Sequence, residues 1–476
     1  MTDAKSAITP LVLDVDGTLL KTDLLLETFW QALGRAPVEC LLCCLRYFSN
    51  RAKLKQRLAE LAELRTDLLP INPEITELAH RSKSRGREIV LASGSDITLV
   101  RQLAKDHEFS EIVYASDGQI NLTGRRKAAA LVAAFGPGGF DYAGDSAVDL
   151  PVWEAAENAI IVGEYPNIAS ALAANGANVE EIVGSWRARD LLRAFRPHQW
   201  VKNVLLFLPL IAAHRFEAAG FLIVFVALIA YSAAASSIYI VNDLLDLEAD
   251  RLHPTKKNRP FASGAVPIGI GMLAGAALGV FALALAYVIS LQMLAIVALY
   301  MTLSLAYSLK LKRMRWVDIA TLAALYTLRV IAGAVAAKVL ATGFLVAFIF
   351  PTFITLGCVK RLTELALATG NERLPGRGYG RADRSDLLNV AGLGTFGALL
   401  AFFLYSFTSA ADVLYPNAWQ LWLALIPIGA WLIRMIVLGW QGKQDYDPIV
   451  FAMRDKYGLA LIALTLTVMF TAASNG

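Results

Sequence analysis

Residues 221–250 read FLIVFVALIAYSAAASSIYIVNDLLDLEAD, an apolar run that ends in an acidic segment. A helix needs about 20 apolar residues to cross the hydrocarbon core of a bilayer, so this stretch predicts a membrane-spanning helix with an acidic end. Similar apolar runs, separated by short charged loops, follow to the end of the chain. We predict nine spans, at residues 200–214, 218–241, 266–288, 291–309, 317–337, 341–359, 388–408, 418–440 and 457–474.

The charges divide the 476 residues into two parts. Residues 1–190 hold 20 Lys+Arg and 26 Asp+Glu, which is the charge density of a soluble domain, whereas residues 191–476 hold only 24 and 14. This division excludes a wholly soluble, disordered or fibrous protein. We predict a soluble domain at residues 1–186 joined to an all-helical membrane domain at residues 187–476.

The positive charges of the apolar part fall mostly on one side of the predicted spans. With the N-terminus inside, 20 of the 24 lysines and arginines lie in inner loops, and only Arg215 and Lys338 lie in outer loops. Lysine and arginine favour the cytoplasmic side of a membrane. We therefore predict a multi-pass protein of the inner (cytoplasmic) membrane, with a cytoplasmic N-terminal domain and the C-terminus outside.

The acidic end of the second predicted span has the spacing of a metal site. Asp243, Asp246 and Asp250 are three and four residues apart, which places them on one face of a helix. Carboxylates so close repel one another unless a cation lies between them, and Mg²⁺ takes oxygen ligands and bridges to phosphates. The next loop, Lys256–Pro260, reads KKNRP and offers cationic partners for phosphate. The pattern predicts diphosphate chemistry at a membrane face.

The segment Asn242–Asp250, the Arg259-Pro260 turn and the nine spans together resemble the UbiA superfamily of intramembrane polyprenyl transferases. The resemblance covers about residues 190–476. It implies a helical bundle around a central cavity with a lateral opening to lipid. It also implies that the aspartate motif binds the Mg²⁺ complex of a diphosphate.

Three further segments resemble the decaprenyl-phosphate phosphoribosyltransferase branch, namely Arg196–Asn203, Tyr307–Arg313 and Leu325–Arg329. This branch transfers ribose 5-phosphate from phosphoribosyl diphosphate to a polyprenyl monophosphate. Two such anionic substrates suit a site rich in lysine and arginine. We assign the transfer chemistry and Mg²⁺ to Asp243, Asp246 and Asp250. We assign substrate binding to Arg196, Lys202, Asn242, Lys256, Arg259, Tyr307, Lys312, Arg329 and Lys360.

Two other functions stay open for the membrane part. Aromatic prenyltransferases of the superfamily use a polyprenyl diphosphate and a 4-hydroxybenzoate-like acceptor, and they usually carry a second aspartate-rich motif. The loop after residue 359 does not match that motif clearly and is dominated by basic residues. A transporter or receptor with a regulatory domain also has many spans, but it gives no reason for three aspartates beside a basic loop.

In the N-terminal part, three apolar runs of strand length end in polar residues. The first precedes Asp14 and Asp16, the second ends at Ser93, and the third precedes Asp145 and Asp149. Helical segments alternate with these runs, which predicts a parallel α/β sheet with a site at the carboxyl edge of its strands.

These residues match the haloacid dehalogenase superfamily of aspartyl phosphotransferases over about residues 8–185. The match implies a Rossmann-like parallel sheet with a helical cap at about residues 19–88. Asp14 would be the nucleophile and Asp16 the general acid and base. Ser93 and Lys127 would bind the phosphoryl group. Mg²⁺ would be held by Asp14, the Asp16 backbone carbonyl and Asp145, and Asp149 would support Lys127 or the metal.

The predicted topology puts both sites on the cytoplasmic side. We therefore expect a bifunctional enzyme whose membrane part makes a polyprenyl-phosphoryl ribose 5-phosphate and whose soluble part removes the 5-phosphate. A phosphatase that acts on an unrelated phosphate, or an inactive one, is the alternative. We expect the lipid bilayer and these substrates as partners and no nucleic acid, and we leave the oligomeric state open.

Overall fold

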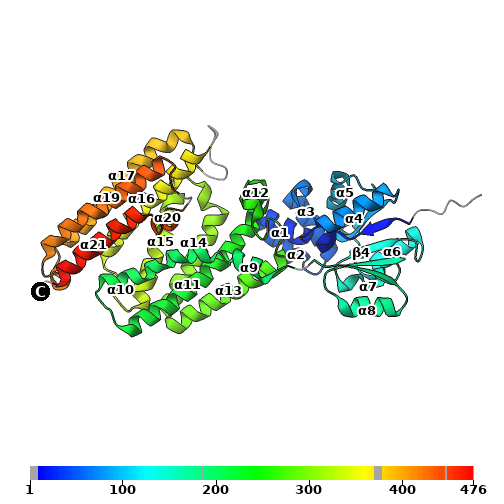
Figure 1. The fold of residues 1–476 in the computed structure, drawn as a ribbon, viewed down its shortest axis with the longest axis horizontal. Coiled ribbons are helices and arrows are strands. Elements are labelled where there is room, and N and C mark those ends of the chain that lie inside the picture. Colours follow the sequence, from blue (N-terminus) through cyan, green and yellow to red (C-terminus); the bar gives the residue numbers. More distant parts are fainter. Residues whose placement is uncertain (1–8, 185, 369–377, 445–446, 475–476) are drawn as a thin grey trace, which may run out of the picture. The chain divides into compact units, whose positions relative to one another are not determined.

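The computed structural model describes residues 9–184, 186–368, 378–444 and 447–474. Two compact units make up the chain (Figure 1). The sheet unit contains Met1–Phe195 together with Tyr239–Ala274, and the helical unit contains Arg196–Ile238 together with Gly275–Gly476. The acidic motif at residues 242–250 is therefore grouped with the N-terminal unit, although it directly follows a long apolar run. Part of the basic loop after residue 359 falls on residues 369–377, outside the described residues.

The sheet unit has six parallel strands in the order β3-β2-β1-β4-β5-β6. In the central strand, Leu11 pairs with Ile89 on one side and with Asp141 on the other. The chain order reverses at β1, which makes the end of this strand the topological switch point where α/β sheets bind ligands. The strands are β1 Leu11–Leu13, β2 Ile89–Asp96, β3 Val113–Ser116, β4 Asp141–Gly144, β5 Asn158–Val162 and β6 Asn178–Ile182.

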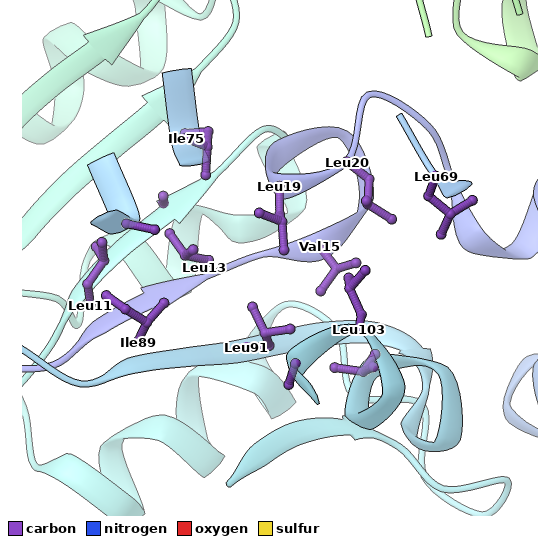
Figure 2. Close-up of a cluster of buried hydrophobic side chains, with 14 of the residues drawn as sticks. Leu11, Leu13, Val15, Leu19, Leu20, Leu69, Ile75, Ile89, Leu91 and Leu103 are labelled. Atoms are coloured by element: carbon purple, nitrogen blue, oxygen red, sulfur yellow. The ribbon is translucent and has the colours of Figure 1, made fainter. Parts of the chain in front are cut away.

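Both faces of this sheet are covered, and the central strand β1 is apolar at all three of its positions. Leu11 and Leu13 point into one core cluster with Ile89 and Leu91 (Figure 2), while Val12 points into the cluster on the other face. Helices α4 (Pro73–Ser84) and α5 (Ile97–Asp106) supply the first cluster. Helices α6 Arg125–Phe135, α7 Leu150–Trp153 and α8 Pro166–Ala174 supply the second. The predicted parallel α/β fold is confirmed.

Three helices between β1 and β2 form a core of their own. Helices α1 (Leu24–Arg35), α2 (Pro37–Tyr47) and α3 (Arg51–Ala62) pack together around Cys40 and Leu58. Helix α4, which lies inside the predicted cap at residues 19–88, instead packs on the sheet. The helical insertion is thus α1 to α3.

Eight helices within the described residues are long and apolar enough to cross a membrane. They correspond to the second to ninth predicted spans, with the largest difference at the end of α16, which continues to Leu367 instead of residue 359. The helices are α11 Ala218–Leu245, α13 Ile268–Ile289, α14 Leu291–Leu309, α15 Val317–Ala336, α16 Gly343–Leu367, α17 Arg384–Tyr405, α19 Leu421–Trp440 and α21 Lys456–Ser474.

Shorter helices and turns connect these elements. They are η1 Val15–Leu19, η2 Thr66–Leu68, η3 Ala147–Asp149, α9 Ala188–Ala194, α12 Leu247–Leu252, η5 Lys256–Asn258, η6 Leu311–Arg313, η7 Arg381–Asp383, α18 Ser409–Leu414, η8 Ala418–Gln420 and α20 Pro448–Ala452.

The predicted first span at residues 200–214 has a different form. A 3₁₀-helix, η4 (Pro197–Phe207), leads into the short helix α10 (Leu208–Ala212). A 3₁₀-helix rises about 2.0 Å per residue, so this segment is more extended than an α-helix of the same number of residues. Its backbone lies directly on α15, because a Cβ built on Gly333 would be only 1.9 Å from the Leu206 carbonyl oxygen. The count of nine spans remains a prediction.

We expect Gly333→Ala to destabilise the helical unit. The added methyl group would meet backbone atoms of η4, and overpacking of this kind costs about 1–3 kcal/mol. Gly392→Ala is the matched control, since a Cβ at Gly392 in α17 meets no atom within 4 Å. Thermal unfolding of the purified protein in detergent would show a lower Tm for Gly333→Ala than for Gly392→Ala, and equal values would contradict the close contact.

Candidate active sites

The carboxyl end of β1 turns sharply and places Asp14 at the centre of the sheet edge. The Asp14 carboxylate accepts a hydrogen bond from Val15 N at 2.8 Å, and Asp14 N donates to the Ala143 carbonyl at 2.8 Å. The turn η1 needs a glycine, because Gly17 has a φ of +72° and a Cβ there would overlap Asp145 Oδ2 at 1.9 Å. The local backbone therefore holds Asp14 and Asp145 close together.

Three of the predicted metal ligands form a compact group. Asp14, Asp145 and Asp149 each offer a carboxylate oxygen, and these oxygens all lie within 4.8 Å of one another. Asp14 and Asp149 are buried, and Asp149 Oδ2 has no hydrogen-bond partner in the described part of the chain. A hard cation such as Mg²⁺ prefers this set of carboxylate oxygens. The side chain of Asp16 is not part of this group, and its predicted contribution through a backbone carbonyl remains a prediction.

Two carboxyl groups of this site have raised pKa values, which means that their negative charges are destabilised there. Burial raises the pKa of Asp14 well above its ordinary value; Lys127 opposes that shift, while the neighbouring carboxylates add to it. Burial, together with Asp149 and Asp16, raises the pKa of Asp145 to about 7. Carboxylates gathered in this way ionise together readily only when a cation is bound among them.

Lys127 supplies one positive charge to the group. Its Nζ lies 3.0 Å from Asp14 Oδ2 and 3.0 Å from Asp149 Oδ1, and it donates to the Tyr142 hydroxyl at 2.7 Å. Burial works against the charged lysine, but Asp14 and Asp149 raise its pKa. Tyr142, which also donates to Asp149 at 3.0 Å, was not predicted from the sequence. The sequence indicates Tyr142 only as an aromatic residue with a hydroxyl group in a buried strand, shortly before Asp145.

Asp16 and Ser93, two other predicted site residues, contact each other directly. Asp16 Oδ2 accepts hydrogen bonds from Ser93 Oγ at 3.0 Å and Ser95 Oγ at 2.6 Å. Asp16 Oδ1 accepts from Leu24 N, in the first turn of α1, at 2.7 Å. These three donors fix the Asp16 carboxylate. Ser95 was missed by the sequence analysis, although it follows Ser93 by two residues in the same strand.

A lysine of the helical insertion also reaches this edge of the sheet. Lys55 Nζ in α3 donates to the Gly94 carbonyl at 2.5 Å and to Asn121 Oδ1 at 3.0 Å. Burial lowers the pKa of Lys55, while Asp16 and Asp23 oppose that shift. Nothing in the local sequence distinguishes Lys55 from its neighbouring lysines, so only the fold reveals it.

We expect Gly17→Ala to remove one divalent-cation site. The new methyl group would displace Asp145, and the residue would also carry a strained positive φ. Gly136→Ala is the matched control, because Gly136 has a φ of +82° but no atom within 4 Å of a built Cβ. Counting bound Mn²⁺ by electron paramagnetic resonance should give one ion fewer per chain for Gly17→Ala only. The same count in both variants would contradict the assignment.

The second acidic group lies at the end of α11. Asp243 belongs to α11, Asp246 lies at the break between the helices, and Asp250 belongs to α12. Asp246 N still bonds to the Asn242 carbonyl at 3.0 Å and Asp250 N to the Asp246 carbonyl at 2.8 Å, so the helical hydrogen-bond pattern continues across the break. Asp243 and Asp250 are buried, and Asp246 is half-buried. Asn242 Oδ1 is buried without a hydrogen-bond partner in the described residues.

Arg259 lies between two of these aspartates. Its Nη1 is 3.1 Å from Asp243 Oδ1 and 2.6 Å from Asp250 Oδ2. Burial raises the pKa of Asp250, and Arg259 opposes that shift. Two carboxylates from successive helices thus converge on one cationic group, and such an oxygen set also fits Mg²⁺. Arg259 was predicted to bind substrate phosphate, and here its partners are the aspartates themselves. Lys256 lies nearby in η5.

In the helical unit, two lysines lie near the carboxylate of Asp447. Lys202 of η4 forms a buried ion pair with Asp447. Burial alone would raise the pKa of Asp447, but Lys202 and Lys360 lower it below its ordinary value. Burial lowers the pKa of His198, and Arg196, Lys202 and Arg454 lower it further. Lys202 and Lys360 were predicted as substrate ligands, whereas Asp447 and Arg454 were missed because a charged inner loop is ordinary in a membrane protein.

Tyr307 is part of a buried polar network. Its hydroxyl donates to Asp318 Oδ1 at 2.8 Å and accepts from Arg361 Nη2 at 3.0 Å. Asp318 and Arg361 are completely buried and share two hydrogen bonds of 2.6 and 2.9 Å. Tyr307 therefore orients a salt bridge in the structure, in addition to its predicted role as a substrate ligand. Lys312 lies half-buried in η6.

Arg329 lies in an aromatic cage inside the bundle. Its guanidinium is 4.9 Å from the ring centre of Tyr300, 5.2 Å from that of Tyr326 and 5.5 Å from that of Tyr231. It also donates to Asn203 Oδ1 at 3.0 Å and to the Tyr300 hydroxyl at 3.1 Å. Asn203 lies in η4, so Arg329 ties that segment to α15. Arg329, which was predicted to bind substrate, therefore also stabilises the packing of the helical bundle.

Comparisons with known proteins identify a family and several relatives of this chain. Residues 204–457 match the profile of the UbiA prenyltransferase family. The uncharacterized protein y4nM of Sinorhizobium fredii is 35% identical over 94% of this chain and 88% of its own length. A decaprenyl-phosphate phosphoribosyltransferase of Mycobacterium tuberculosis is 34% identical over 58% of this chain and 90% of its own length. The structure of a UbiA homolog from Archaeoglobus fulgidus bound to GPP and Mg²⁺ aligns with a TM-score of 0.45 and 15% identity, over 60% of this chain and 99% of that one.

The matched residues form more than half of the chain, and the phosphoribosyltransferase is matched over nearly its whole length. The chain therefore belongs to the UbiA prenyltransferase family, and decaprenyl-phosphate phosphoribosyltransferases are among its homologues.

Proposed function

We propose that this chain is a bifunctional membrane enzyme that carries out two consecutive steps. The membrane part transfers ribose 5-phosphate from phosphoribosyl diphosphate to a polyprenyl phosphate, and the N-terminal part removes the 5-phosphate from the lipid product. The observation that carries the first step is the 34% identity to a decaprenyl-phosphate phosphoribosyltransferase over 90% of that protein.

In the transfer step, an oxygen of the lipid phosphate attacks C1 of the ribose. The bond between C1 and the diphosphate oxygen breaks, and pyrophosphate leaves with the electron pair. Asp243, Asp246 and Asp250 would hold Mg²⁺, which neutralises the charge on a leaving diphosphate. Arg259, which bonds to Asp243 and Asp250 in the structure, would exchange these partners for substrate phosphate oxygens.

The cations of the helical unit suit the remaining anionic groups. Lys202 and Lys360 both lie close to the buried carboxylate of Asp447. We propose that they bind the 5-phosphate or the lipid phosphate, together with Arg196 and Lys312. Asn242, with its unsatisfied buried Oδ1, would accept a hydrogen bond from a ribose hydroxyl.

The hydrolytic step uses the chemistry of aspartyl-phosphate enzymes of the haloacid dehalogenase type. Asp14 attacks the phosphorus while Asp16 protonates the leaving ribose oxygen, and Asp16 then takes a proton from the water that cleaves the aspartyl-phosphate. Lys127, 3.0 Å from Asp14, neutralises the phosphoryl oxygens. Mg²⁺ held by Asp14, Asp145 and Asp149 would offset the charge of the incoming phosphate.

Contacts within the sheet unit support coupling of the two steps. The first turn of α1 bonds to Asp16 through Leu24 N. Glu27, in the same turn, forms a buried ion pair with Arg251, with bonds of 3.1 and 2.5 Å. Arg251 directly follows Asp250 in the chain. One turn of helix thus connects the acid and base of the hydrolytic site to the aspartates of the transfer site, and a linked second site acts at high effective concentration.

This proposal includes the predicted orientation, with both sites on the cytoplasmic side of the inner membrane. The distribution of lysine and arginine supports it, with 20 of them in predicted inner loops and two in predicted outer loops. The same orientation gives both sites access to soluble phosphoribosyl diphosphate.

Two substrate sets offered separately to the purified protein test the transferase assignment. One set is polyprenyl phosphate with phosphoribosyl diphosphate, and the other is polyprenyl diphosphate with 4-hydroxybenzoate, each with Mg²⁺. We expect a lipid product from the first set only, and none when Mg²⁺ is chelated. Prenylation of 4-hydroxybenzoate would contradict the proposal and establish the aromatic alternative.

A further inference from the structure

Helix α2 presents an apolar face that nothing in the described chain covers. Val38, Leu41, Leu42 and Leu45 are exposed by 64, 52, 59 and 79%. At 100° per residue these four side chains fall within an arc of about 100°, which makes one continuous stripe. Phe48, just after the helix, extends the stripe with 84% exposure. We call these five residues the α2 face.

The opposite side of the same helix is an ordinary core surface. Cys40 and Cys43 are buried and pack with Leu58 of α3 and Ala32 of α1. Helix α2 is therefore apolar on both sides, although it lies at the surface of the unit. Exposed apolar stripes of this kind mark sites of interaction with a membrane or another protein.

The contacts of α1, the helix that directly precedes α2, reach the ends of two membrane-spanning helices. A Cβ built on Gly34, at the end of α1, would lie 3.7 Å from the carbonyl oxygen of Leu245, the last residue of α11. A Cβ built on Gly269, at the start of α13, would lie 3.7 Å from Leu26 Cδ1 near the start of α1. Helix α1 thus crosses from the start of α13 to the end of α11. Helix α2 begins at Pro37, three residues after Gly34.

This arrangement is held by a buried charge pair, so it is a defined part of the unit. Arg251 binds Glu27 of α1 and also donates from Nε to the Ala262 carbonyl at 3.1 Å. Thr22 Oγ1 donates to Glu27 Oε1 at 2.7 Å. Removal of either partner would leave a buried charge, which is strongly unfavourable.

We propose that the α2 face inserts into the interfacial region of the bilayer in which α11 and α13 are embedded. Helices that lie in a membrane surface have such an apolar stripe with basic residues at its border. Arg46 and Arg51 are exposed at the end of α2 and the start of α3, where they would meet anionic lipid headgroups. Insertion of the α2 face would hold the helical insertion, and the candidate site at the edge of the sheet, at the membrane surface where a polyprenyl lipid resides.

Photo-cross-linking of the full chain in lipid nanodiscs tests this placement. The photoreactive amino acid p-benzoylphenylalanine would replace Leu42 or Leu45, and nanodiscs of phosphatidylethanolamine and phosphatidylglycerol would supply the lipid. Ile112, which is 60% exposed before β3, is the matched control position. A Tm equal to that of the wild-type protein would show that each variant is folded.

We expect lipid adducts at Leu42 and Leu45, identified by mass spectrometry, at yields at least about tenfold above those at Ile112. Yields equal to those at Ile112 would overturn the proposal. Cross-links from Leu42 to a second copy of the chain would also overturn it and would show that the α2 face is a dimer interface. The result does not depend on the substrates of either site.

Discussion

Replacing Asp243 by Asn is expected to lower phosphoribosyl transfer by about a thousandfold, which corresponds to about 4 kcal/mol. Asp243 is buried and shares the Arg259 guanidinium with Asp250, so its carboxylate is central to the oxygen set that would hold Mg²⁺. An amide cannot replace that negative charge. The measurement is the transfer of labelled ribose phosphate into the lipid phase by protein in nanodiscs.

Asp386→Asn provides the matched control for this substitution. Asp386 lies in the first turn of α17, is half-exposed and pairs with Arg315 at the surface. The same change from carboxylate to amide should leave transfer within about twofold there, since surface ion pairs contribute little. Normal Mg²⁺-dependent transfer by Asp243→Asn would contradict the assignment of the aspartate motif. The Asp243→Asn variant should still carry out the proposed hydrolysis at Asp14. This result would show that its loss of transfer is a local effect and is not caused by unfolding.

Replacing Asp14 by Asn should abolish hydrolysis in the N-terminal part, with a loss of at least about a thousandfold. The change removes the oxygen that we propose as the nucleophile, and it removes one of the three carboxylates within 4.8 Å of one another. Hydrolysis of p-nitrophenyl phosphate by the full chain would measure the effect without any lipid substrate. Transfer of ribose phosphate should remain, because Asp243 and Asp250 are unchanged.

Glu154→Gln is the control for the Asp14 substitution. Glu154 is exposed directly after α7 and is not one of the carboxylates of the Asp14 group. It should hydrolyse the probe at the normal rate. Equal rates for wild type and Asp14→Asn would show that the N-terminal part does not use an aspartyl-phosphate, and the proposed hydrolytic step would be wrong.

The lengths of apolar runs and the polar residues at strand ends were sufficient to predict most of the architecture. Eight of the predicted spans correspond to long apolar helices, because hydrophobic length is a local property of the sequence. The parallel sheet was also predictable, since apolar runs such as Leu11–Leu13 end in polar residues at one edge. The 3₁₀ form of η4 was not predicted, and neither was its close packing against Gly333 of α15, which joins residues far apart in the sequence.

Some site residues could be predicted from local sequence motifs, whereas others reach the site only through the tertiary packing. Asp14, Lys127, Asp145 and Asp149 were predicted from motifs, and the structure brings them together. Lys55 reaches the same edge from a helix with an undistinguished sequence, and only the packing of α3 reveals it. The aspartate partners of Arg259 were also missed, because a loop sequence does not show which charges will meet.

The most direct test of the account is mass spectrometry of the lipids formed from polyprenyl phosphate, phosphoribosyl diphosphate and Mg²⁺. Wild type and Asp14→Asn would be compared in the same nanodiscs. We expect wild type to yield the ribosylated lipid without its 5-phosphate and Asp14→Asn to accumulate the 5-phosphorylated lipid. The same product from both proteins would contradict the claim that one chain carries out both steps.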